Sequence, residues 1–107
     1  MGDLMGVADI VFLDDTLYAV LAGGGCSHGN PTSPNGVVKV DTATGKWSLV
    51  AELGAFLKAH QTRYESADDC EPDGTFYGAI AHDGSVYTVE PNHGEVPSVS
   101  KRGQITR

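Results

Sequence analysis

Short apolar segments separated by turn residues recur along this chain, and they predict β-strands. Residues 17–21, Leu-Tyr-Ala-Val-Leu, are apolar throughout, which is typical of a strand covered on both faces. Asp14-Asp15 and Asp83-Gly84 precede two such segments, where a tight hairpin turn is expected. The pattern predicts eight strands, at 7–13, 16–22, 36–41, 46–51, 76–82, 85–90, 95–100 and 103–107.

The predicted strands fall into two copies of one unit. Residues 14–20, Asp-Asp-Thr-Leu-Tyr-Ala-Val, align with residues 83–89, Asp-Gly-Ser-Val-Tyr-Thr-Val, which lie 69 positions later. From Val37 onward the offset falls to 59, because the segment between the second and third strands is longer in the first copy. Repeated four-stranded units with buried inner strands are the pattern of β-propeller blades.

We therefore expect an all-β fold in which residues 1–107 form one unit of two four-stranded antiparallel β-propeller blades. The first blade covers about 7–51, the connection 52–75 and the second blade 76–107. One short helix is predicted in the connection, since apolar or aromatic residues there follow the spacing i, i+3, i+4 and i+7. These residues are Leu53, Phe56, Leu57 and His60.

Two blades leave one apolar face of each sheet uncovered, and known propellers hold about four to eight blades. Several copies of the chain are therefore expected to complete a ring by head-to-tail contacts. We predict a homo-oligomer, with three copies favoured over four. The ring, rather than the single chain, is then the functional form.

The composition narrows the possible partners. Fourteen acidic residues against seven basic ones give a formal charge of −7, so binding to nucleic acid through phosphate contacts is not expected. No apolar run approaches the length of a membrane span. The N-terminal residues lack the basic start and apolar stretch of a signal peptide, which favours a cytoplasmic over a secreted protein. Cys26 and Cys70 are the only cysteines. They are interpreted as free thiols, with a disulfide or a shared metal site as alternatives.

Several motifs resemble the ScyD/ScyE family of bacterial β-propeller proteins. They are Gly23-Gly24-Gly25-Cys26, residues 34–41 (Pro-Asn-Gly-Val-Val-Lys-Val-Asp), residues 71–75 (Glu-Pro-Asp-Gly-Thr) and residues 89–95 (Val-Glu-Pro-Asn-His-Gly-Glu). The similarity extends from about Gly6 to Arg107. It implies a longer, single-chain propeller related to NHL-repeat and lactonase-like rings, and it implies no particular reaction.

Polar segments at 23–35, 61–74 and 90–94 are expected to converge at one end of the blades. Loops on a rigid scaffold are a common place for binding sites. The candidate ligand-binding residues are Glu90, Asn92, His93, Asn35 and His28. Glu90, Asn92 and His93 also form a candidate metal site, because carboxylate and amide oxygens suit Ca²⁺ or a similar divalent cation, and His extends the choice towards Zn²⁺ or Mn²⁺. The alternative is that Glu90 accepts backbone N–H groups in a turn.

The best prediction of function is a non-catalytic binding ring for a polar small molecule, a glycan or a cation. A metal-dependent, lactonase-like hydrolase is the first alternative, with the cation polarising a carbonyl. A purely structural or protein-interaction module is the second. Binding is preferred because the sequence contains no complete catalytic set.

Overall fold

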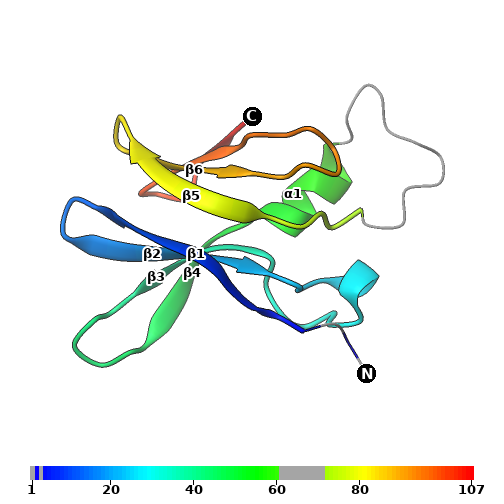
Figure 1. Cartoon of the computed structure of the whole chain (residues 1–107), viewed down its shortest axis with the longest axis horizontal. Coiled ribbons are helices and arrows are strands. Elements are labelled where there is room, and N and C mark those ends of the chain that lie inside the picture. The colour runs from blue at the N-terminus through cyan, green and yellow to red at the C-terminus, as the bar shows by residue number, and fades with distance from the viewer. Residues whose placement is uncertain (1, 3, 61–71) are drawn as a thin grey trace.

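The computed structural model describes residue 2, residues 4–60 and residues 72–107, and its strands form two four-stranded antiparallel sheets (Figure 1). The first sheet contains β1 (Gly6–Leu13), β2 (Thr16–Ala22), β3 (Gly36–Val40) and β4 (Trp47–Glu52), in that order. The second contains β5 (Tyr77–His82), β6 (Ser85–Val89), β7 (Ser98–Ser100) and β8 (Ile105–Thr106). The all-β prediction with two antiparallel sheets of four strands is confirmed.

The predicted helix is also present, as α1 (Leu53–Ala59). Glu52 precedes it, and its carboxylate accepts a hydrogen bond from the Ala55 backbone N–H, which caps the first turn. Leu53 and Leu57 are buried on the inner side of the helix. A 3₁₀ turn, η1 (Cys26–His28), lies between β2 and β3, and the sequence pattern did not predict it.

Two strands are shorter than expected. β7 begins at Ser98 rather than at 95, because Pro97 has no N–H to donate and Glu95 instead pairs with Glu90 in an isolated bridge. β8 covers only two residues rather than 103–107. The last strand thus pairs with β7 over a short distance, so the second sheet has a short edge strand.

The two sheets pair their first strands in the same way. Ile10 faces Ala19 and Phe12 faces Leu17 in the first sheet, and the partners 69 residues later, Ala79 with Thr88 and Ala81 with Val86, face each other in the second. A bulge interrupts β1 before Asp9, and another interrupts β5 before Ala79. Corresponding positions therefore lie on corresponding faces of the two sheets.

The core lies between the sheets, where β1 runs beside β5. Its buried residues come from both sheets and from the connection: Leu13, Tyr18, Val20, Val37, Ala51, Leu53, Leu57, Phe76, Val86 and Val99. A polar link crosses the same boundary, since the Ala79 backbone N–H donates to the Asp9 carboxylate at 2.8 Å. Lys101 in the β7–β8 turn also pairs with Asp14 in the β1–β2 turn. The two sheets are thus joined by packing along their length and by polar contacts at several points.

The described part of the chain contains no helix of the length and apolar character that a bilayer crossing requires; α1 has seven residues.

Truncation of Phe76 tests the packing between the sheets. Phe76 is fully buried in this core, so Phe76→Ala should lower the free energy of unfolding by about 3–5 kcal/mol, the cost of removing a large buried side chain. Urea denaturation measures the change. Leu4→Ala is the control, because Leu4 is 99% exposed and its loss should change stability by no more than about 0.5 kcal/mol. Equal effects of the two variants would contradict this account of the core.

Candidate functional site at the loop-rich end

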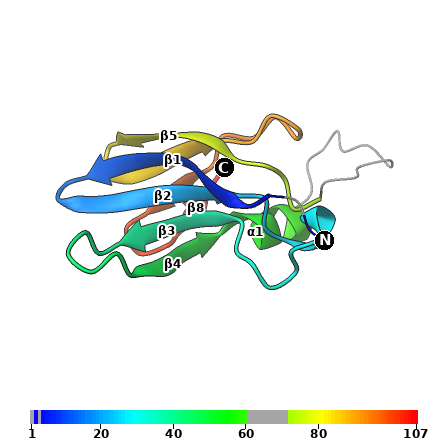
Figure 2. The ribbon, with the colours of Figure 1, turned by 60° about the horizontal axis from the view of Figure 1, so that its bottom comes forward.

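The long connections gather at one end of the sheets, while the other end carries short turns (Figure 2). The loop between β2 and β3, helix α1 and the segment between β6 and β7 all lie at the loop-rich end. Hydrogen bonds join them to residues 73–75, which lead into β5. The predicted convergence of the polar segments is therefore observed for the residues that the structure describes.

Asp73 connects three of these elements. Its Oδ2 accepts hydrogen bonds from the Ser27 N–H at 2.7 Å and from the Ser27 hydroxyl at 2.6 Å, and its Oδ1 lies 3.3 Å from the Lys58 ammonium. Burial alone would raise the pKa of Asp73, but the hydrogen bonds from Ser27 and the ion pair with Lys58 outweigh it and lower the pKa. The Asp73 carboxylate in turn raises the pKa of Lys58. Asp73 is therefore held as a carboxylate that ties η1 to α1.

His28 and Asn35 hold the backbone of the same segment. The Asn35 side-chain amide donates to the carbonyls of Asp73 and Gly74, at 2.8 and 2.9 Å, and His28 Nε2–H donates to the Gly74 carbonyl at 2.9 Å. Asn35 is fully buried, and its Oδ1 has no hydrogen-bond partner among the residues that the structure describes. Both residues were candidate ligand-binding residues, and in the structure their donors are directed at the protein backbone.

Glu90 holds the second sheet's side of the site. It is fully buried, and its carboxylate accepts hydrogen bonds from the backbone N–H groups of Thr75, Asn92 and His93, at 3.1, 3.2 and 2.8 Å. The His93 ring donates through Nδ1 to the same carboxylate at 2.6 Å. These are the contacts of the turn interpretation, in which Glu90 satisfies backbone N–H groups after the strand.

The divalent-cation site at Glu90, Asn92 and His93 stays a prediction. Among residues 2, 4–60 and 72–107, no group of three or more His, Cys, Asp or Glu side chains is arranged to hold a metal ion. The acidic residues Asp68, Asp69 and Glu71, which were expected to add charge at this end, lie outside the described residues, as does Cys70. Cys26 is a free cysteine with an exposed side chain.

A cleft of about 520 Å³ opens beside this hydrogen-bonded cluster. Its polar lining residues include Cys26, Glu52, Lys58 and Asp73, and the β4 side chains Trp47 and Leu49 form an apolar wall. The loop of residues 31–34 closes one side. Ion-paired groups beside an exposed indole give a surface that can contact both the polar and the apolar parts of a small ligand.

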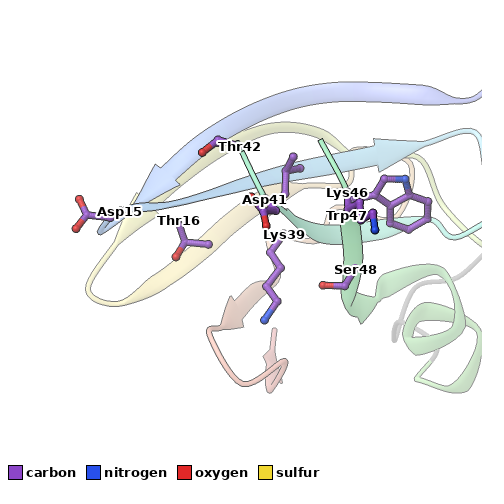
Figure 3. Close-up of a pocket in the computed structure, with 9 residues that line it drawn as sticks. Asp15, Thr16, Lys39, Asp41, Thr42, Lys46, Trp47 and Ser48 are labelled. Carbon is purple, nitrogen blue, oxygen red and sulfur yellow. The ribbon is translucent and has the colours of Figure 1, made fainter. Parts of the chain in front are cut away.

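A second hollow, of about 440 Å³, lies at the end with the short turns (Figure 3). Asp15, Thr16 and residues from the β3–β4 hairpin line it, and Lys39 extends to the same side as Ser48. Its charged side chains project from exposed strand ends and turns. This groove is less organised than the loop-end cleft, where hydrogen bonds fix Asp73, and it was not predicted.

Sequence reasoning did not select Asp73, Lys58 or Ser27 as site residues. Asp73 belongs to the Glu-Pro-Asp-Gly motif, but its partner Ser27 lies 46 residues earlier, and no local pattern relates the two. The sequence does carry a signal for this close approach, the glycine at position 25, which has a φ of 97° in the structure. A Cβ there would come within 2.6 Å of the Asp73 carboxyl carbon, so the glycine permits the loop to approach the carboxylate.

The chain was compared with protein-family models, with curated proteins and with solved structures, and nothing matched it in any of the three comparisons.

Replacement of Glu90 tests the role of its carboxylate in the turn. Glu90→Gln exchanges one acceptor oxygen for an NH₂ group that faces N–H donors, so we expect the free energy of unfolding to fall by about 1–3 kcal/mol. Urea denaturation monitored by circular dichroism measures the loss. The control is Glu95→Gln, where the carboxylate pairs with Arg107 near the surface and a change below about 1 kcal/mol is expected. A Glu90→Gln protein as stable as the wild type would contradict the turn role.

The lowered pKa of Asp73 predicts an acid-sensitive contribution to stability. The ordinary value is 3.8, and a folded-state pKa below the unfolded one means that the unfolded chain binds the proton more readily. This contribution is therefore complete above about pH 5 and is lost as the pH falls through the folded-state pKa. In Asp73→Asn the free energy of unfolding should fall less steeply between pH 5 and pH 3 than in the wild type. Asp15→Asn, in an exposed turn, controls for the change in net charge, and an unchanged slope in Asp73→Asn would contradict the prediction.

Proposed function

We propose that the chain is a pair of β-propeller blades acting as a non-catalytic ligand-binding module. It binds a polar small molecule, a glycan or a cation at its loop-rich end. The observation that carries this proposal is the open cleft beside a cluster of loops that hydrogen bonds lock together. A cleft with fixed polar groups on a rigid scaffold is the usual form of a small-ligand site.

The propeller part of the proposal is supported by the arrangement of the sheets. Each sheet has its four strands in sequence order, the first strands β1 and β5 lie side by side, and the sheets pack face to face. The resemblance to the ScyD/ScyE family favours the same architecture. Both sheets also expose large apolar side chains on their outer faces, and monomeric proteins rarely expose such continuous patches. We propose that copies of the chain cover these faces in a homo-oligomeric ring, with three copies favoured over four.

The chemistry of the cleft favours a ligand that is both polar and partly apolar. Lys58, with 43% of its side chain exposed, forms an ion pair with the buried Asp73 carboxylate, and hydroxyl or amide groups of a ligand can accept hydrogen bonds from the Lys58 ammonium. The Trp47 indole, more than half exposed, provides a flat surface for a sugar ring or an aromatic group. Glycans and small polar molecules meet both requirements.

The fluorescence of Trp47 tests ligand binding, because it is the only tryptophan and it lines the cleft. Titration with a panel of neutral oligosaccharides should give a saturable change in emission for at least one member. Lys58→Met should weaken that binding about tenfold, since a hydrogen bond to a charged group contributes about 1.5 kcal/mol. The control is Lys46→Met, which makes the same exchange on the other side of Trp47, in the groove of Figure 3.

The outcomes of this titration distinguish an error in the location of the site from an error in the proposed function. If Lys46→Met weakens binding and Lys58→Met does not, the ligand occupies the groove at the short-turn end and the assignment of the cleft is wrong. A parallel titration with CaCl₂ tests the cation, and there His93→Ala should weaken binding if Glu90, Asn92 and His93 hold it. No saturable change with any oligosaccharide or with CaCl₂ would contradict the ligand-binding proposal.

A further inference from the structure

The outer face of the first sheet, turned away from the core, is largely apolar. The strand pairings place one set of side chains on this face, and the most exposed are Val7 at 60% and Phe12 at 59%. We call its β1–β3 part the first open face: Val7, Ile10, Phe12, Leu17, Ala19, Leu21, Val38 and Val40, of which Ala19, Leu21 and Val38 are buried within the chain. Trp47 and Leu49 continue this side of the sheet on β4, where they line the loop-end cleft. Such a surface is unfavourable in water unless another apolar surface covers it.

The outer face of the second sheet is also apolar along β5 and β6. Tyr77 pairs with Val89 and Ile80 pairs with Tyr87, so these four side chains share the face turned away from the first sheet. Ile80 is 63% exposed and Val96, beside it, is 57% exposed. We call these five residues the second open face.

The contact between the sheets within one chain shows how such faces pack. The packed face of the first sheet presents Val11, Tyr18 and Val20 to the core. The residues 69 positions later are Ile80, Tyr87 and Val89, which belong to the second open face. The second open face therefore carries the same kind of side chains, at the same strand positions, as a face that already packs against a sheet.

The same relation holds for the receiving surface. In the core, the second sheet packs against the first sheet with the face that carries Ala79, Val86 and Thr88. The residues 69 positions earlier are Ile10, Leu17 and Ala19, all on the first open face. The first open face thus corresponds to the side of the internal contact that the second sheet provides, and the second open face corresponds to the side that the first sheet provides. A first open face is therefore complementary to a second open face, and neither is complementary to another copy of itself.

We infer that the second open face of one copy packs against the first open face of the next copy, in the register of the internal contact. This inference rests on the proposed assembly of copies and adds which surfaces meet and in which direction. In that register β5 of one copy lies beside β1 of the next, as β1 lies beside β5 within the chain. The contact is head to tail, so every copy in a closed ring uses both open faces.

Two complementary variants test the direction of the contact. Ile80→Asp places a carboxylate on the second open face, and Phe12→Asp places one on the first, where burying an unpaired charge opposes association. Each variant alone should be a monomer at concentrations where the wild type is assembled. An equimolar mixture should form dimers of twice the 11.2 kDa chain mass and nothing larger, because one undamaged pair of faces remains. Light scattering after size-exclusion chromatography measures the masses.

Controls keep this test decisive. Phe12 and Ile80 are both more than half exposed in the chain, so the two variants should fold, which circular dichroism verifies. Ile10→Asp with Val96→Asp repeats the test at other positions of the same faces. Ala43→Asp, in the exposed β3–β4 turn, adds the same charge outside both faces and should keep the wild-type mass.

Three results would overturn the inference. Dimers formed by Ile80→Asp alone would show that first open faces pair with each other, and dimers formed by Phe12→Asp alone would show the same for second open faces. Either result would leave association between copies standing but would exclude a ring of three, which needs head-to-tail contacts. A wild-type chain that is monomeric at micromolar concentration would overturn the inference together with the proposed assembly, while ligand binding at the cleft is judged separately by the Trp47 titration.

Discussion

The buried backbone of residues 73–75 is the constraint on which the loop-rich end depends. These residues lie between α1 and β5, outside the strand ladders, yet their N–H and carbonyl groups must be hydrogen-bonded because an unpaired buried backbone group costs about as much as a lost hydrogen bond. Side chains from both sheets supply the bonds. Asn35 and His28, from the first sheet's loop, hold the carbonyls, and Glu90, at the end of β6, holds the Thr75 N–H. The entry of the chain into the second sheet is therefore fixed by residues of both sheets.

The same requirement separates structural polar residues from those available to a ligand. Glu90, His28 and Asn35 have the residue types of a binding site, but their hydrogen-bonding groups are directed at the backbone inside the protein. Lys58 and Trp47 stand at the cleft with much of their side chains exposed. The hydrogen bonds of the buried residues fix the walls of the cleft, and the exposed residues provide the groups that can contact a ligand. A ligand at the loop-rich end would therefore contact these exposed side chains, which lie beside the predicted site residues, rather than the predicted residues themselves.

Local patterns predicted most of the fold and little of the site. The apolar runs and turn residues located β2 and β6 to within a residue or two, and the spacing of Leu53 and Leu57 located α1, because these elements bury one side in a regular way. β7 and β8 were predicted too long, since Pro97 and the Glu90–Glu95 bridge end the pairing early. The link between Ser27 and Asp73 depends on how distant segments pack, and no periodicity along the chain contains that information.

The order of the strands has a consequence for how the protein folds. In both sheets each strand pairs with its neighbour in sequence, so the ladders can form from nearby segments without closing long loops first. During synthesis the first sheet is complete at Glu52, before β5 emerges at Tyr77. The bond between Glu90 and the Thr75 N–H and the packing of Phe76 then form last, because they need both sheets. Until that moment the nascent chain exposes apolar surface on both sides of its first sheet, which makes this the stage most open to aggregation.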